Sequence, residues 1–62
     1  MTNTGRNAVN SIDALSVAAE FLLCAIRALA QGADPQGQDV QDPVKWAQAK
    51  INEGVTLMKG AN

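Results

Sequence analysis

Apolar side chains recur through the first half of the chain at alternating spacings of four and three residues. Spacings of this kind place every such position on one stripe of an α-helix. The stripe consists of Ala8, Ile12, Leu15, Ala19, Leu22, Ile26 and Leu29. Residues 7–31 are also rich in alanine and leucine and contain no proline or glycine. The pattern predicts one long helix over about residues 7–31, with room for a short helical turn before it.

A cluster of turn-forming residues follows this stretch. Gly32 stands where a glycine commonly ends a helix at the C′ position. The run Asp34-Pro35-Gln36-Gly37 has the composition of a type I β-turn, with Asp first, Pro second and Gly fourth. We therefore expect a loop over residues 32–42.

The second helix has a clear signal at its start. Asp42 is a favoured N-cap residue, and Pro43 suits the first helical position because the N–H that proline lacks would have no partner there. The sequence then predicts a helix over about residues 43–59. The expected fold class is all-α: a two-helix antiparallel hairpin that forms a single domain over residues 1–62.

The width of the apolar surface on the first helix predicts self-association. A second apolar stripe, made of Ala14, Ala18, Phe21, Ala25 and Ala28, runs beside the first. The second helix offers the stripe Val44, Ala47, Ile51, Val55 and Met58. One such stripe covers only one partner stripe, so we expect an uncovered interface made of Val17, Phe21, Cys24 and Ala28.

The size of the chain supports the same expectation. A domain of 62 residues buries only about 60% of the surface of its unfolded chain. With one cysteine and no histidine, the chain can form neither an internal disulfide nor an ordinary zinc site. We therefore expect the hairpins to assemble into a homo-oligomeric helical bundle, without a metal.

Charge and composition argue against several classes of function. The formal net charge is −1, whereas proteins that bind DNA or RNA neutralise several phosphates with basic side chains. The most apolar stretch, residues 17–30, contains two charged residues and is shorter than the roughly 20 residues of a membrane span. No signal peptide is visible after Met1. These features predict a cytoplasmic protein that binds neither nucleic-acid polymers nor membranes.

Candidate catalytic groups are few. Without histidine, the commonest general base is missing. Ser11 and Ser16 have no visible base partner and are interpreted as surface or capping residues. Cys24 is interpreted as a small hydrophobic residue. We therefore expect a protein that is not an enzyme and holds no cofactor.

The second helix carries the residues of greatest functional interest. Trp46 and Lys50 are four residues apart and therefore lie on one face of a helix, with Glu53 continuing the line. In one interpretation Trp46 anchors the hairpin and Lys50 pairs with Glu53 at the surface. In the other, Trp46 is an aromatic platform and Lys50 a cation for an anionic ligand. Gly54, a weak helix former, indicates the close approach of a second helix or of a flat ligand.

This second helix resembles a known family. The run Asp42–Lys59, DPVKWAQAKINEGVTLMK, resembles the second helix of the small hairpin domain in phage anti-CBASS and anti-Thoeris proteins. The run Ala18–Leu23, AAEFLL, is similar to their first helix. Proteins of this family sequester the cyclic nucleotide signals of bacterial immunity without hydrolysing them. The resemblance implies an assembly of hairpins, often a hexamer, with cyclic di- or trinucleotides bound between protomers.

The same resemblance suggests which residues would bind a ligand. Lys50 matches the basic position early in the second helix, and Ile51 and Gly54 match the apolar and small positions that follow. Because the chain is nearly neutral, we expect Lys50 and Trp46 to be joined by Arg27 or Arg6 from other subunits. The expected setting is the cytoplasm of an infected bacterium.

Two hypotheses about function follow. In the first, the chain is a non-enzymatic sponge for cyclic oligonucleotides, which counteracts a CBASS-like defence. In the second, it is a structural or adaptor hairpin that binds a protein partner and no small molecule. A helix-turn-helix DNA-binding protein is a distant third, because the expected loop is longer than the usual turn of about three or four residues.

Overall fold

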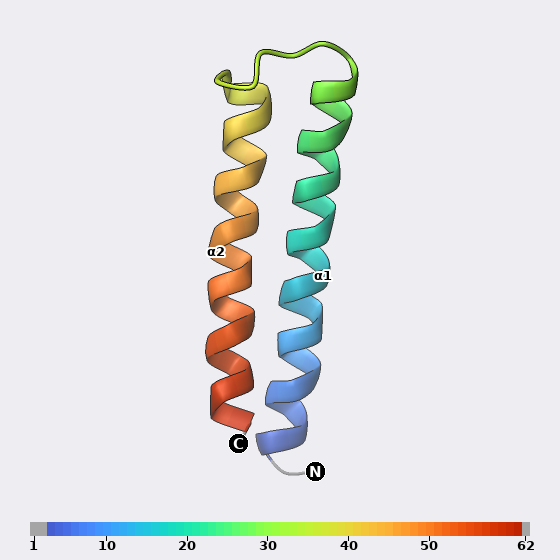
Figure 1. The fold of residues 1–62 in the computed structure, drawn as a ribbon. Coiled ribbons are helices and arrows are strands. Elements are labelled where there is room, and N and C mark those ends of the chain that lie inside the picture. The colour runs from blue at the N-terminus through green and yellow to red at the C-terminus, as the bar shows by residue number, and fades with distance from the viewer. Residues whose placement is uncertain (1–2, 62) are drawn as a thin grey trace.

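The computed structural model describes residues 3–61 and consists of two α-helices that run antiparallel, side by side (Figure 1). Helix α1 spans Asn3–Ala30 and helix α2 spans Gln38–Ala61. No strand is present in this part of the chain. The hairpin measures 46 × 14 × 11 Å between its outermost Cα atoms. The all-helical hairpin predicted from the sequence is therefore confirmed.

The end of α1 is set by Gly32, as predicted. Gly32 has a φ of +93°, a backbone conformation that favours glycine. The N–H of Ala33 donates to the carbonyl of Ala28 (3.0 Å), and the N–H of Gly32 donates to the carbonyl of Leu29 (3.0 Å). This pair of hydrogen bonds is the Schellman motif, which satisfies carbonyl groups that the last helical turn leaves open.

The predicted β-turn also forms. The N–H of Gly37 donates to the carbonyl of Asp34 (2.8 Å), and the carboxylate of Asp34 accepts the N–H of Gln36 (3.0 Å). Gly37 then acts as the N-cap residue of α2, because its carbonyl accepts the N–H of Gln41 (2.9 Å). The loop is therefore shorter than the predicted 32–42, and α2 begins at Gln38.

Asp42 and Pro43 do not begin α2, contrary to the prediction. Pro43 lies inside the helix, where it removes one backbone hydrogen bond, which would run to the carbonyl of Asp39. Burial compensates for this loss, since the additional turn places Val40 (6% exposed) against α1 and Pro43 is itself buried. Tertiary packing thus outweighs the local signal that proline gives in the sequence.

Helix α1 likewise starts earlier than predicted, at Asn3 rather than near Asn7.

Small residues form the contact between the two helices, which we call the seam. On α1 its buried members are Ser11, Ala14, Ala18 and Ala25; on α2 they are Val40, Pro43, Ala47 and Gly54. Interhelical distance depends on the side chains at the contact, so a seam of alanine and glycine lets the helices approach closely. At Gly54, a Cβ atom would lie only 2.8 Å from Cγ of Leu15. Of the two explanations for Gly54, close helix packing is the one that the geometry supports.

The predicted pairing of the apolar stripes is wrong. The large residues Val44, Ile51, Val55 and Met58 were expected to face α1, yet they are 36–47% exposed, and only Ala47 of that stripe is buried. Phe21 and Ala28, expected to be uncovered, lie against α2 and are half-buried. The reason is steric: the stripe of small residues on α1 permits a tighter contact than the stripe of large ones. Ser11, expected at the surface, is 2% exposed within the seam.

Candidate functional site

Trp46 lies on the outer edge of the seam with its side chain half-exposed. Its ring contacts that of Phe21, with centroids 5.6 Å apart and planes inclined by 60°. Tilted aromatic pairs at this separation are favourable. Phe21 therefore supports Trp46 from one side, while 51% of the surface of Trp46 stays open to solvent. Both interpretations of Trp46 have support: the residue helps to anchor the hairpin and also presents an aromatic surface.

Lys50 lies one helical turn beyond Trp46 and makes an ion pair. Its Nζ is 3.3 Å from Oε2 of Glu53, and the two side chains are 40% and 52% exposed. Exposed pairs of this kind contribute little to stability, about 0–1 kcal/mol. The predicted surface ion pair is therefore confirmed. An incoming anion could displace Glu53 at small cost, because solvent reaches both partners.

Arg27 and Arg6 lie on α1, far along the hairpin from Lys50. Trp46 of α2 contacts Phe21 of α1, and Gly54 of α2 faces Leu15 of α1. Lys50 lies midway between Trp46 and Gly54, so it is level with about residue 18 of α1. Arg27 is nine residues from that level, or about 13 Å at ~1.5 Å per residue, and Arg6 is twelve residues away, or about 18 Å. Both side chains are exposed. One chain therefore brings together Trp46 and Lys50 but neither arginine.

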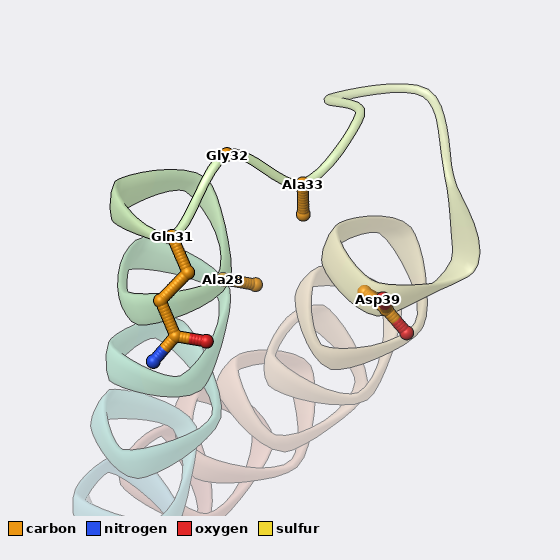
Figure 2. A pocket seen from close by; sticks show the side chains of 5 residues that line it. All are labelled: Ala28, Gln31, Gly32, Ala33 and Asp39. Carbon is orange, nitrogen blue, oxygen red and sulfur yellow. The ribbon is translucent and has the colours of Figure 1, made fainter.

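A shallow hollow is present at the loop end of the hairpin (Figure 2). Its volume is about 360 Å³, and it is lined by Ala28, Gln31, Gly32, Ala33 and Asp39. Figure 2 shows that α1 and the loop supply four of these residues and that Asp39 comes from the first turn of α2. None of the predicted ligand-binding residues lines it, and its charged side chain is acidic. The hollow is therefore unsuited to a nucleotide phosphate.

The hairpin has two sides that differ sharply in charge. Five half-buried residues continue the spacing of the seam and are counted as seam positions: Asn7, Phe21, Ala28, Lys50 and Leu57. Successive residues of a helix are about 100° apart, so residues that follow a seam position point to one side and residues that precede it point to the other. Because the helices are antiparallel, the following residues of both helices share a side. We call this side the uncharged face: Ala8, Ile12, Leu15, Ala19, Leu22, Ile26, Leu29, Gln41, Val44, Gln48, Ile51, Val55 and Met58.

The opposite side, which we call the charged face, carries Trp46 and the predicted arginines. It consists of the residues that precede seam positions: Arg6, Asn10, Asp13, Val17, Glu20, Cys24, Arg27, Asp39, Asp42, Trp46, Ala49, Glu53 and Thr56. Val17 and Cys24, its apolar members on α1, are exposed. Only these two of the four residues predicted as an interface on α1 are open, so the larger apolar surface lies on the other side.

Sequence reasoning missed that the large apolar residues of the uncharged face are exposed, although a signal for it was present. The four charged residues of α1 recur every seven residues: Arg6, Asp13, Glu20 and Arg27. They therefore fix which side of the helix faces water. The alanine stripe on α1 matches Ala47 and Gly54 on α2, and pairing these small residues would have left the large residues outside.

Known proteins offer no guide to this arrangement. Searches of protein-family models, curated proteins and solved structures find no match to the chain. Within residues 3–61, no three histidine, cysteine or acidic side chains are grouped so as to hold a metal ion. Over the same residues, neither helix combines the length and apolar character that a bilayer crossing requires.

Proposed function

We propose that this hairpin is a non-enzymatic binding protein that sequesters cyclic di- or trinucleotides. In this proposal Trp46 stacks on a base and Lys50 pairs with a phosphate. The resemblance of residues 42–59 to phage proteins that counteract CBASS-like immunity supports the ligand class and the setting of an infected bacterium. The ligand is held and not hydrolysed.

One observation carries the proposal: an exposed tryptophan is held in place beside a lysine. The contact with Phe21 at 5.6 Å limits the freedom of the Trp46 ring, so stacking a base on it costs little additional order. Stacking of a base on an aromatic side chain contributes about 1–3 kcal/mol. Lys50 lies one turn away, within the span of a nucleotide. A base and its phosphate are therefore matched by two neighbouring side chains.

Assembly would raise the affinity of such a small site. A single Trp46 and Lys50 pair offers one cation, which is a weak match to a ligand with two or three phosphates. We propose that the protein works as a homo-oligomer, so that a ligand meets more than one copy of the pair. The arginines at positions 27 and 6 would take part only from other copies, because they are distant from Lys50 within one chain.

The test uses isothermal titration calorimetry with a panel of cyclic di- and trinucleotides. Lys50→Glu removes the cation and is expected to abolish binding. Lys59→Glu is the matched control, because it makes the same change of charge on the same helix, more than two turns away. The control is expected to keep wild-type affinity. Equal affinity of Lys50→Glu and the wild type would refute the site.

A second variant is expected to change the affinity for cyclic nucleotides in the opposite direction. Glu53→Gln removes the partner that Lys50 holds at 3.3 Å and leaves Lys50 free for a phosphate. Since the exposed pair contributes up to about 1 kcal/mol, the variant is expected to bind up to about five times more tightly. If Glu53→Gln weakens binding instead, Lys50 does not contact the ligand in the proposed way.

A second candidate function is that of an adaptor that binds a different protein. The exposed apolar side chains of the uncharged face favour it, since large apolar patches mark interaction sites. The adaptor needs this face to be open in the free protein, whereas the sponge does not. A folded monomer that binds no cyclic nucleotide would favour the adaptor.

A further inference from the structure

We infer that a second copy of the chain covers the uncharged face, so that two hairpins form a four-helix bundle. This inference assigns the surface through which two copies pair. Trp46 and Lys50 then lie on opposite outer sides of the pair, so a ligand that meets two copies of the site bridges hairpins of different pairs. The inference is independent of any ligand, because Trp46 lies on the other side of the hairpin.

The exposed apolar area is sufficient for a stable dimer. Eight side chains of the uncharged face are large, apolar and between 36% and 63% exposed: Ile12, Leu22, Ile26, Leu29, Val44, Ile51, Val55 and Met58. Their exposed surface amounts to about 700 Å², or about 1,400 Å² for two copies, within the ~1,200–2,000 Å² of stable interfaces. Ile12 (63%) and Ile26 (60%) are the most exposed of the eight. A partner would therefore bury more large side chains than the seam does.

The shape of the hairpin also fits a second copy. Two hairpins 46 Å long that meet face to face place four helices around a common apolar core, which is the arrangement of a four-helix bundle. A two-fold axis lets the same patch serve on both copies. Ala19 leaves room between its larger neighbours Leu15 and Leu22 for side chains of the other copy.

Charge selects this face over the opposite one. None of the thirteen residues of the uncharged face carries a charge, so two copies can meet there without removing an ion from water. The charged face is different, because it carries a row of four charged residues along α1. Their charges follow the order plus, minus, minus, plus: Arg6, Asp13, Glu20 and Arg27. This order of charges reads the same in both directions. When the rows of two copies are aligned in register, parallel or antiparallel, each charge therefore meets a charge of the same sign. The charged face is therefore a poor site for a symmetric contact.

The test compares two variants that place the same charge in exposed apolar positions of α1. Ile26→Glu lies on the uncharged face, and Leu23→Glu lies on the side of α1 away from α2, where Leu23 is 38% exposed. The mass is measured by native mass spectrometry and by light scattering at several concentrations. The wild type and Leu23→Glu are expected at twice the 6.5 kDa of the chain or a higher even multiple. Ile26→Glu is expected to weaken self-association about a hundredfold or more, because symmetry places two unpaired carboxylates in the bundle.

Val55→Lys and Val17→Glu complete the test. Val55→Lys probes the uncharged face from α2 and is also expected to dissociate the copies. Val17→Glu probes the charged face and is expected to leave the mass unchanged. Circular dichroism reports whether each variant keeps its helices. If Ile26→Glu and Val55→Lys both unfold, dilution of the wild type replaces them as the test. The inference then requires the helicity of the wild type to fall on dilution.

The possible failures are distinguishable. A wild type that stays folded at 6.5 kDa at millimolar concentration overturns both the homo-oligomer and this interface. An oligomer that resists Ile26→Glu and Val55→Lys but dissociates with Val17→Glu overturns only the interface assigned here. Loss of cyclic nucleotide binding in Lys50→Glu with an unchanged mass concerns the ligand site alone.

Discussion

Replacing Gly54 with alanine tests whether the close approach of the two helices is necessary. Gly54 lies in the middle of α2, where alanine favours the helix by about 1 kcal/mol over glycine. In an isolated helix the substitution would therefore be stabilising. In the hairpin, Gly54 is buried against α1, and the new methyl group needs space that the seam does not offer.

The expected cost follows from the distances. The new Cβ atom would lie 2.8 Å from Cγ and 3.0 Å from Cδ2 of Leu15, whereas carbon atoms pack at about 3.5–4.0 Å. Leu15 or the whole of α2 must therefore move by about 1 Å. Overpacking of this kind costs about 1–3 kcal/mol. Leu15 is only half-buried and can shift, so we expect a cost of about 2 kcal/mol and a net loss of about 1 kcal/mol after the gain in helix propensity.

The assay is thermal unfolding followed by circular dichroism at 222 nm, with all proteins at one concentration. A loss of about 1 kcal/mol lowers the Tm of a chain of this size by about 4–8 °C. Gly60→Ala is the control: its Cβ would meet only the amide end of Asn7, at 3.1 Å, and that flexible group can turn away. We expect Gly60→Ala to be neutral or slightly stabilising. If Gly54→Ala is as stable as Gly60→Ala, the seam does not have the tight contact described here.

Three further predictions concern the loop and the assembly. Gly32→Ala is expected to lower the free energy of unfolding by about 1–2 kcal/mol, because its φ of +93° disfavours a side chain although no atom lies within 4 Å of the new methyl group; urea unfolding measures the change. Asp34→Ala removes the hydrogen bond to the N–H of Gln36 and is expected to cost about 0.5–1 kcal/mol in the same assay. For the wild type, Tm is expected to rise by several degrees with each tenfold increase in protein concentration, because association stabilises the folded chain. A Tm independent of concentration between about 1 and 100 μM would contradict the dimer.

The fold could be predicted because its signals are local. The spacing of apolar residues specifies two helices, and Gly32 with the turn at Asp34 specifies where the chain reverses. The start of α2 could not be predicted in the same way. Pro43 is a strong local signal for a helix start, and it is outweighed by the burial of Val40 against α1, which depends on residues distant in the sequence.

The choice of face was the harder problem. Periodicity identified both stripes of α1 but could not decide which one meets α2, because large and small apolar residues count alike in such a pattern. The decision depends on the distance between helices, which Ala18, Ala47 and Gly54 make short. For the candidate site, Trp46 and Lys50 lie four residues apart within α2, a spacing that places them on one side of the helix. Their relation to Arg27 and Arg6 depends on the register of the hairpin, which the sequence does not display.

The distribution of side-chain size would allow the proposed assembly and the proposed ligand binding to coexist in so small a protein. Four of the eight buried residues of the seam are alanine, and burying an alanine contributes far less than the 1.5–3 kcal/mol of a valine, leucine or isoleucine. A single hairpin with such a core is marginal, so most of the available hydrophobic stabilisation lies on the uncharged face. Copies that met there would leave Trp46 and Lys50 on the outside, so the proposed association would leave the proposed ligand site open. Single substitutions are then expected to remove the proposed association and the proposed ligand binding separately.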